Sequence, residues 1–442
     1  MPERLRARLL PAWVEPVAVF RWLEAAESEV FWLDAGADAR TGWSFIGRGT
    51  IAELPAALRL DAASSDATLP PFSGGWVGWL DYESGARAAG VPVFESTTEG
   101  GAWLGATHVV AFDHDAGQTW ALADADGLDT WTDALAAMSA SAADVASSRP
   151  GAPPTGAPLI AEARHDTDEY AGLIQRCREL IRAGIAYQLC LTTRFSVPGT
   201  HDPVEVYLRL RAATPAHHGG FVRIGGRALL SASPEQFLHA ERGVIRTRPI
   251  KGTRPRSADA AQDAALAAEL AENPKERAEN VMIVDLMRND LSRVCEPGTI
   301  RVDGLWVVES YPAVHQLVST VTGTAVAGTT VGALLDATFP AGSMTGAPKL
   351  SAMARLHDLE GAARGVYAGC FGYVGVDGAL DLAMVIRSIV IDAEGAVVGA
   401  GGGITWGSDP AAEVAEVATK ARAPLAALGA VLPVLWGSDI LN

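Results

Sequence analysis

The sequence predicts a fold of mixed helices and strands, and two kinds of periodicity carry that prediction. Short apolar or aromatic runs separated by Gly, Asp and Ser have the length and spacing of strands. Other segments place apolar residues three and four positions apart, as on one face of a helix. With 442 residues, 49% of them apolar, the chain can form two or three ordinary domains or one large body of two lobes. We therefore expect a folded globular protein.

The N-terminal third of the chain is predicted to be rich in strands. Its expected elements are strands at 31–34, 43–47, 75–80 and 108–112 and an Ala-rich helix over 128–145. No residue here has a catalytic pattern, and Trp76 and Trp79 are expected to pack in the core, where aromatic side chains dominate. Pro, Gly, Ser and Ala then give a stretch of linker composition. The predicted boundaries are an N-terminal region at 1–146, a linker at 147–158, a catalytic domain at 159–430 and a C-terminal tail at 431–442.

The catalytic region begins with a helix and continues mainly in strands. The expected elements are a helix over 166–184, a strand over 186–195, a strand-turn-strand over 229–238, a strand at 243–245 and neighbouring strands at 364–369 and 381–387. The turn within 229–238 places Glu235 after Ser233 and Pro234. A glutamate in that position is an ordinary turn residue when it is taken alone.

Composition and charge exclude several classes of function. The net charge of −17 opposes binding to nucleic acid or to an anionic membrane surface. No apolar run reaches the roughly 18 residues that span a bilayer, and Pro11, Glu15 and Pro16 interrupt any signal core, so we expect a cytoplasmic protein. The four cysteines lie far apart without metal-binding spacing, which favours buried thiols over disulfides or ligands.

One basic run stands out in this acidic chain. Residues 246–256 carry Lys251 between Pro249 and Gly252, two residues that favour a turn with the lysine at a fixed point. Taken alone, the run is most simply a solvated basic loop. However, residues 249–253, Pro-Ile-Lys-Gly-Thr, resemble the signature of the chorismate-utilising enzymes. The central lysine is the form of the aminodeoxychorismate synthase component I branch, whereas the anthranilate synthase branch has alanine there.

Similar motifs run from Tyr187 to Lys420, so the resemblance covers more than half of the chain. It implies the α+β fold of chorismate-utilising enzymes, with two large, mostly antiparallel sheets packed orthogonally and helices outside. It also implies amination of chorismate by ammonia to 4-amino-4-deoxychorismate, the precursor of 4-aminobenzoate and folate. In that reaction Glu235 protonates the departing 4-hydroxyl and Lys251 attacks C2. Ammonia then adds at C4 and expels the lysine.

Two helices carry a repeated pair of glutamates. The first starts at Asn273-Pro274 and presents Glu276 and Glu279 on one face, and the second starts at Ser408-Asp409-Pro410. On the second helix, Glu413, Glu416 and Lys420 share a face. Alone, these are most simply solvated glutamates that favour the helix dipole and form an i,i+4 pair. The resemblance implies that Glu279 and Glu416 ligate Mg²⁺, with Glu276 and Glu413 supporting them.

The resemblance also implies a set of substrate-binding residues. They are Gln188, Thr253, Thr345, Gly346, Tyr367, Arg387, Gly401, Gly402 and Lys420. Isochorismate and salicylate synthases have a water-activating lysine at the position of Gln188, and an amide is a poor base, so water is not the expected nucleophile. Gln316 departs from the family, because most relatives have histidine there.

The ammonia must come from elsewhere in the cell. The sequence has no Gly-x-Cys-x-Gly glutaminase motif, so we expect a separate glutaminase subunit or free ammonium as the source. The first alternative function is that of anthranilate synthase component I, against which Lys251 argues, and isochorismate synthase is disfavoured by Gln188. A catalytically silent subunit is the third alternative, and the combined presence of Glu235, Lys251, Glu279 and Glu416 argues against it.

Overall fold

The structure is a computed structural model that describes residues 2–60, 69–95, 100–141, 156–312 and 314–437. The strands are β1 (Arg6–Leu9), β2 (Val30–Asp34), β3 (Trp43–Ile51), β4 (Gly75–Leu80), β5 (Ala102–Asp113), β6 (Gln118–Ala123), β7 (Leu159–Ile160), β8 (Glu162–Ala163), β9 (Gln188–Pro198), β10 (His218–Ile224), β11 (Arg227–Ser233), β12 (Gln236–Glu241), β13 (Val244–Thr247), β14 (Ile250–Pro255), β15 (Arg301–Ser310), β16 (Val314–Thr324), β17 (Gly346–Ala347), β18 (Cys370–Gly375), β19 (Leu380–Met384), β20 (Ser388–Ile391), β21 (Gly395–Ile404) and β22 (Ala430–Val431). The helices are α1 (Pro16–Glu24), α2 (Tyr82–Ala88), α3 (Leu128–Ser141), α4 (Thr167–Arg182), α5 (Pro203–Ala213), α6 (Ala260–Glu272), α7 (Pro274–Leu291), α8 (Val331–Thr338), the short 3₁₀ helix η2 (Gly342–Met344), α9 (Lys349–Glu360), α10 (Pro410–Ala427) and α11 (Val434–Gly437).

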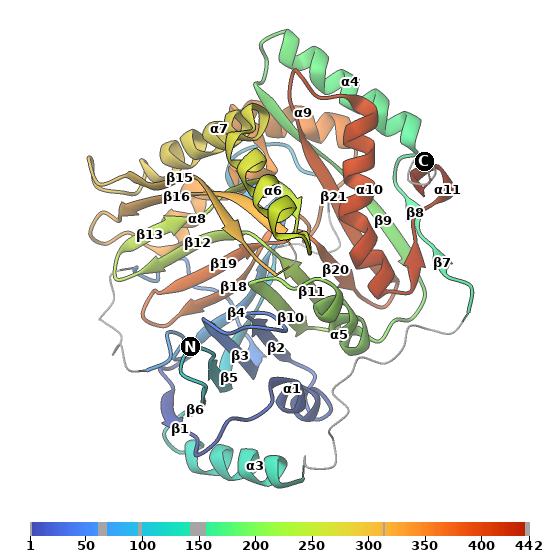
Figure 1. The fold of residues 1–442 in the computed structure, drawn as a ribbon. Coiled ribbons are helices and arrows are strands. Elements are labelled where there is room, and N and C mark those ends of the chain that lie inside the picture. Colours follow the sequence, from blue (N-terminus) through green and yellow to red (C-terminus); the bar gives the residue numbers. More distant parts are fainter. Residues whose placement is uncertain (1, 61–68, 96–99, 142–155, 313, 438–442) are drawn as a thin grey trace.

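The strands form two large antiparallel halves that meet at β5. One half runs in the order β9-β21-β20-β11-β10-β2-β3-β5, and the other runs β5-β4-β18-β19-β12-β13-β16-β15. In Figure 1, β9 and β21 descend beside α10 while β12, β13 and β16 run across the view. The α+β class and the two large, mostly antiparallel sheets are therefore confirmed. The two sheets are hydrogen-bonded to each other through β5, which the sequence did not indicate.

The N-terminal region is built into the same sheets as the catalytic region. Strand β2 pairs with β10, and β4 pairs with β18, so the first 123 residues supply central strands. Residues 142–155, most of the expected linker, lie outside the described residues. The segment expected to be a tail begins with β22, which pairs with β7, and Trp436 in α11 is 3% exposed against Tyr170 and Phe195. That part of the tail is therefore packed onto the body.

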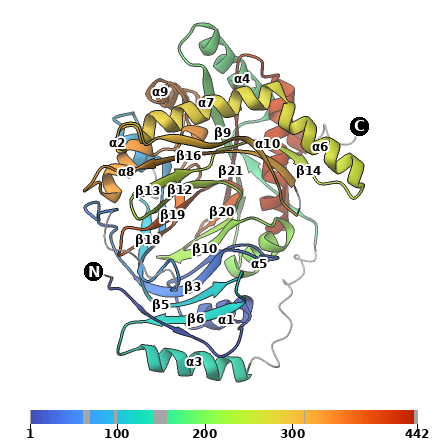
Figure 2. The same cartoon turned by 60° about the vertical axis from the view of Figure 1, so that its left-hand side comes forward.

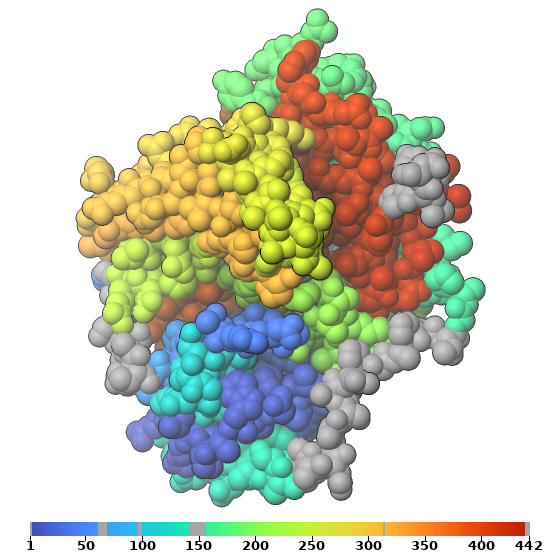
Figure 3. Space-filling model, viewed as in Figure 1, coloured from blue at the N-terminus to red at the C-terminus, as the bar shows by residue number. Residues whose placement is uncertain are grey.

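Helices cover the outer faces of both halves. Figure 2 shows α6 and α7 lying over β14 and β16, and α3 lying against the N-terminal strands. Helix α10 packs on β21, with α4 and α5 beside it. On the face shown in Figure 3, the yellow surface of α6 and α7 borders the red surface of α10. None of the helices in the described ranges is both long and apolar enough to cross a membrane.

Local sequence signals explain where the two glutamate helices begin. The Asn273 side chain accepts hydrogen bonds from the Lys275 and Glu276 amides, both at 3.1 Å, and proline occupies the first turn. Asp409 caps α10 in the same way, accepting from the Ala412 amide at 3.0 Å. Both predicted helix starts are confirmed.

Two local predictions were wrong. Residues 364–369 form a turn that precedes β18, because Gly365 and Ala368 take positive φ and break the strand. The expected turn at Lys251 is instead a bulged strand, β14. Trp76 and Trp79 are each 1% exposed, and the four cysteines are free and buried, as expected.

Candidate active site

Lys251 projects from a bulge in β14. The register with β16 shifts between Ile250 and Thr253, and Gly252 in the bulge has a φ of +81°. A side chain at Gly252 would be strained by that φ and would lie 3.0 Å from the Glu276 carboxylate. The half-buried Lys251 reaches β21, where its Nζ lies 3.5 Å from the position that a Cβ on Gly403 would take. The bulge thus directs the amine toward the interior rather than into solvent.

Gln188 lies against the same glycine. Its side chain is fully buried, and neither its Nε2 nor its Oε1 has a hydrogen-bond partner among the described residues. A Cβ at Gly403 would overlap the Gln188 amide. A buried amide without partners is costly, so a bound molecule that supplies them is the expected complement.

Glu235 lies between β11 and β12 and is 7% exposed. Burial raises the pKa of Glu235, and the Lys251 charge, a hydrogen bond with Ser343 and the Lys420 charge offset this only in part. A carboxyl held neutral by burial can donate a proton. The structure therefore places the predicted acid and the predicted nucleophile within electrostatic reach of each other.

The four predicted metal-binding glutamates come from the two capped helices. Lys275 Nζ lies 3.9 Å from Glu279 Oε1 on α7 and 3.9 Å from Glu413 Oε1 on α10, which brings the two faces together. Glu416 pairs with Lys420 at 2.7 Å, and Glu276 lies 3.5 Å from Arg254. The glutamate side chains range from 5% exposed for Glu413 to 49% for Glu416.

The chemistry of this glutamate group suits a hard divalent cation. Burial raises the pKa of Glu279 and of Glu413. Neighbouring carboxylates add to the increase: Glu276 and Glu413 for Glu279, and Glu416 for Glu413. Glu279 Oε1 is buried without a hydrogen-bond partner in the described chain. In the described ranges no three acidic, histidine or cysteine side chains are gathered closely enough to hold a metal ion as they stand. The carboxylate oxygens, among them a Glu279 Oε1 that lacks a hydrogen-bond partner in the described chain, nevertheless fit Mg²⁺, which accepts few carboxylates.

The predicted Thr345-Gly346 element forms the wall beside β9. Gly346 pairs with Leu189 at a φ of +145°, and a Cβ there would overlap the Gln188 carbonyl oxygen. Thr345 is fully buried, and its hydroxyl donates to the Ala341 carbonyl oxygen at 3.1 Å. Glycine is required here because the chain must approach β9 closely.

Tyr367 lies against the glycines of β21, and Arg387 lies within electrostatic reach of Tyr367. The Tyr367 ring packs against Gly399, and burial raises the pKa of its hydroxyl. Arg387 has a φ of 54°, and burial lowers the pKa of its guanidinium although Tyr367 and Glu416 oppose the shift. Lys420 Nζ donates to the Gly401 carbonyl oxygen at 2.8 Å. Gly402 faces α10, because a Cβ there would lie 3.1 Å from Glu413 Oε2.

Two positions lie at the margin of this arrangement. Thr253 is exposed on β14, where it pairs with Gln316 on β16. Gln316 is 5% exposed, and its Oε1 has no hydrogen-bond partner in the described chain. The roles of all the predicted site residues stay predictions. Apart from Thr253 and Gln316, the structure brings these residues to the region around Lys251 and β21.

Sequence reasoning missed the polar residues that support the site from behind. Ser343 bonds to Glu235, and the buried Arg364 pairs with Glu360 at 2.7 Å. Their spacing carries no catalytic pattern, so only the tertiary structure reveals them. The sequence also did not indicate the ion pairs of the arginines near Lys251: Arg248 pairs with Glu309, and Arg254 pairs with Glu269.

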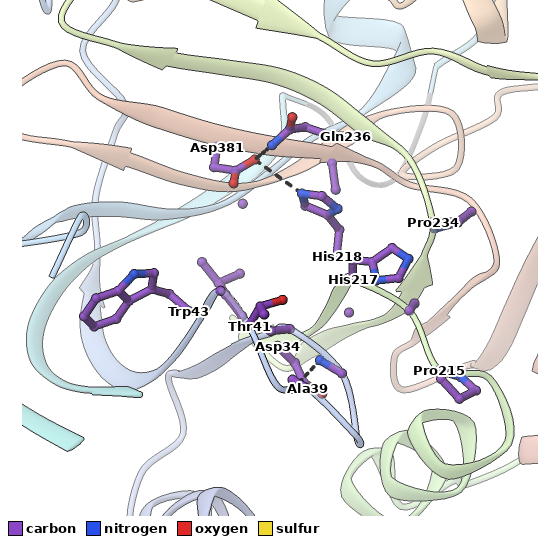
Figure 4. A pocket seen from close by; sticks show the side chains of 18 of the residues that line it. Asp34, Ala39, Thr41, Trp43, Pro215, His217, His218, Pro234, Gln236 and Asp381 are labelled. Atoms are coloured by element: carbon purple, nitrogen blue, oxygen red, sulfur yellow. Dashed lines mark hydrogen bonds and ion pairs between the residues drawn. The ribbon is translucent and has the colours of Figure 1, made fainter. Parts of the chain in front are cut away.

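A cavity of about 600 Å³ lies next to this site but contains neither of its predicted catalytic residues. It is lined by β2 and the loop after it, by residues 215–219 and by parts of β12 to β14, and it contains neither Lys251 nor Glu235. In Figure 4, His218 and Gln236 both point toward Asp381, at 3.6 and 2.9 Å. The sequence did not indicate this cavity, because its walls come from segments far apart in the chain.

Comparisons with known proteins agree with the geometry. The chain is 43% identical over 373 residues to an aminodeoxychorismate synthase of Streptomyces pristinaespiralis, which covers 81% of this chain and 51% of the relative. The chain thus spans about half the length of that relative. It is 38% identical over 454 residues to anthranilate synthase component 1 of Streptomyces coelicolor, covering 96% of this chain and 88% of the relative.

A solved structure extends the similarity to the whole fold. Anthranilate synthase component I from Streptococcus pneumoniae is 28% identical to this chain and superposes with a TM-score of 0.71, covering 96% of this chain and 93% of the other. Residues 21–426 match the chorismate binding enzymes, and the chain is therefore a member of that enzyme family.

Proposed function

We propose that the chain aminates chorismate with ammonia and releases 4-amino-4-deoxychorismate, the precursor of 4-aminobenzoate in folate synthesis. The observation that carries this proposal is the position of Lys251. Its amine lies next to Gly403 and Gln188. Its positive charge works to lower the pKa of Glu235, Glu279 and Glu416. A solvated basic loop would not do this.

The reaction has two displacement steps. In the first, Glu235 gives its proton to the 4-hydroxyl, which leaves as water, while neutral Lys251 Nζ forms a bond to C2 and both ring double bonds shift toward C4. In the second, ammonia forms a bond to C4 and returns one proton to the Glu235 carboxylate. Both double bonds move back, and the bond between C2 and Nζ breaks. The lysine leaves as an amine, so the product differs from chorismate only in the group at C4.

The remaining predicted residues bind and orient the substrate. Tyr367 and Arg387, with the amides of Gly401 and Gly402, suit the carboxylate of the enolpyruvyl side chain. The fully buried Gln188 has amide atoms free to bond to the substrate, and because an amide is a poor base it does not activate water. The proposed nucleophiles are therefore lysine and ammonia.

A magnesium ion is proposed at the glutamates of α7 and α10. Glu279 and Glu416 would hold it, with Glu276 and Glu413 in support, and Lys420 adds positive charge nearby. Bound there, the ion would neutralise the ring carboxylate of chorismate.

Anthranilate synthesis is the second candidate, and the long alignment with the Streptomyces coelicolor protein favours it. It would use the same substrate and metal but release pyruvate. Lys251 argues against it, since anthranilate carries its amino group at C2, the carbon to which Lys251 is proposed to bond. Ammonia is proposed to come from a separate glutaminase subunit, in line with relatives whose names denote a first component.

The test is product analysis. The purified chain is incubated with chorismate, Mg²⁺ and ammonium at mildly alkaline pH. The products are then separated by chromatography and identified by mass spectrometry. The expected product retains its pyruvyl group and yields 4-aminobenzoate when a lyase is added. Anthranilate with free pyruvate would establish the second candidate instead.

The covalent step has its own test in the intact protein. Without ammonium, the wild-type chain is expected to gain the mass of a dehydrated chorismate, and Lys251→Ala is expected not to. The exposed Arg288→Ala on α7, whose partner is the exposed Asp285, serves as the control and is expected to keep the adduct. A Lys251→Ala variant with full amination activity would contradict the covalent role.

A further inference from the structure

A fully buried ion pair, Arg364 with Glu360, connects segments that carry residues of the proposed site. Arg364 and Glu360 side chains are 2% and 3% exposed, and the guanidinium meets the carboxylate through two bonds of 2.7 and 2.8 Å. Arg364 also donates to the Met344 carbonyl oxygen at 2.7 Å and to the Cys190 carbonyl oxygen at 2.9 Å. Glu360 Oε1 accepts from the Thr192 amide at 2.9 Å. One ion pair thus ties together β9, the turn before β17 and the turn at 364–369.

Each of these contacts lies beside a predicted substrate-binding residue. Met344 directly precedes Thr345, Cys190 lies two residues after Gln188, and Tyr367 follows Arg364 by three residues. The Cys190 amide also donates to the Thr345 carbonyl oxygen at 2.8 Å. The pair therefore fixes the distances between three elements that face the substrate.

The backbone of these elements needs such support. The turn at Thr345 has φ −115° and ψ −82°, and β17 is only two residues long. The Tyr367 turn contains Ala368 at a φ of 64°. Strained, irregular segments persist only when their surroundings hold them. A rigid, planar guanidinium with several fixed donors is suited to that task, whereas a lysine is not.

The N-terminal region completes the network. The Glu83 carboxylate of α2 accepts from the Arg364 amide at 2.7 Å and from the Gly365 amide at 2.9 Å. The Tyr82 ring lies 4.3 Å from the Arg364 guanidinium. The turn that carries Tyr367 is therefore held from both regions of the chain.

We infer that Arg364 and Glu360 are positioning residues, which set the spacing of β9, the Thr345 turn and the Tyr367 turn for chorismate. This inference rests on the proposed site. A bidentate buried pair of this kind gives little net stability over an apolar replacement, but losing one partner leaves a buried charge. Its expected contribution is thus to geometry as much as to stability, and the two are separable by experiment.

The chain offers a matched control pair. Arg211 on α5 meets Asp34 at the end of β2 through bonds of 2.5 and 3.3 Å, and the side chains are 16% and 2% exposed. Its guanidinium also lies over an aromatic ring, 4.6 Å from Trp32, and donates to the Gly36 carbonyl oxygen at 3.2 Å. None of these partners belongs to the proposed catalytic site.

The experiment compares Arg364→Lys with Arg211→Lys well below their unfolding temperatures. Chorismate affinity is measured by calorimetric titration in a Lys251→Ala background, in which the proposed covalent adduct cannot form. The values of kcat and KM for chorismate and ammonium are measured by product formation with Lys251 in place. Both variants are expected to lower the Tm. Only Arg364→Lys is expected to weaken chorismate binding, by about tenfold or more, because small displacements of binding groups have large effects. Equal chorismate affinity in the two variants would overturn the inference.

Glu360→Gln keeps the inference testable if Arg364→Lys does not fold. It preserves the size of the side chain and leaves Arg364 its two carbonyl acceptors, and it is expected to weaken chorismate binding in the same direction. In the double variant, the two effects on binding are expected to be less than additive, since the residues act as a unit. A wild-type chain that binds chorismate but does not aminate it would refute the proposed function, while the affinity ratios would still decide this inference.

Discussion

Lys275 on α7 lies 3.9 Å from Glu413 on α10, and its ammonium group forms an ionic link between the two glutamate faces. The same group lies 3.9 Å from Glu279. The lysine side chain is 57% exposed, so it is free to move away. The Lys275 charge offsets the negative charge of Glu279 and Glu413, as a bound cation would. Lys275 and a metal ion are therefore expected to act against each other.

The first prediction concerns Mg²⁺ and the Lys275→Met variant. Without metal, Lys275→Met is expected to have a lower Tm than the wild type, because repulsion between buried glutamates is no longer offset. Added Mg²⁺ is expected to raise the Tm of both proteins, and more so in the variant. A ligand at one hundred times its Kd adds about 2.7 kcal/mol to the free energy of unfolding. Thermal melts with and without Mg²⁺ measure the effect.

Arg288→Met is the matched control for this prediction. Arg288 is on the same helix, is 52% exposed and pairs with the exposed Asp285 rather than with α10. The control variant is expected to respond to Mg²⁺ as the wild type does. Melts of wild type and Lys275→Met that do not move with Mg²⁺ would contradict the metal assignment.

Sequence patterns located the elements well where the signal is local. The strand predicted at 75–80 is β4 with the same bounds, and the helix predicted from Pro274 is α7. Strand alternation and helix caps depend only on neighbouring residues, so they can be recognised without tertiary structure. The site residues were predicted from the resemblance, because a lysine between Pro249 and Gly252 does not by itself indicate a catalytic role.

Tertiary contacts decided what the sequence could not. The segment at 364–369 has the composition of a strand, but the Arg364 bonds to Glu360 and to Glu83 hold it as a turn. The bulge at Gly252 lies against Leu270 on α6 and Glu276 on α7, the two helices that follow β14. Both features are packed against other elements of the fold, which local patterns in the sequence do not indicate.

The second prediction concerns Glu235→Gln. The amide cannot give up a proton as an acid does, so amination is expected to fall by about 10²- to 10⁴-fold. Chorismate affinity is expected to change little, because the side chain keeps its size and its hydrogen-bonding atoms. Calorimetric titration and product formation measure the two quantities. A variant with wild-type kcat would remove Glu235 from the role of acid.

The same variant has an expected effect on stability against pH. Burial raises the pKa of Glu235 in the folded state, so the folded chain holds this proton more tightly than the unfolded chain does. Stability is then lost as pH rises from the unfolded pKa through the raised folded pKa, by at most about 1.4 kcal/mol per pH unit. Glu235→Gln is expected to remove this loss and to be the more stable protein at pH 8, but not at pH 4. The exposed Glu272→Gln on α6 is expected to show no such difference.

The third prediction concerns Gly403, against which Gln188 and Lys251 converge. A Cβ at this position would overlap the Gln188 amide and lie 3.5 Å from Lys251 Nζ. The end of a glutamine side chain can shift, so Gly403→Ala is expected to fold, with Gln188 and Lys251 displaced. Displacement of a reacting group by about 1 Å is expected to lower kcat/KM for chorismate by about 100-fold. Gly407→Ala is the control, because a Cβ there meets nothing within 4 Å, and its kinetic constants are expected to equal those of the wild type. If Gly403→Ala turned over chorismate as fast as Gly407→Ala, the reacting ring would have to lie elsewhere than between Lys251 and Gln188, because no substrate held there could tolerate the added methyl group.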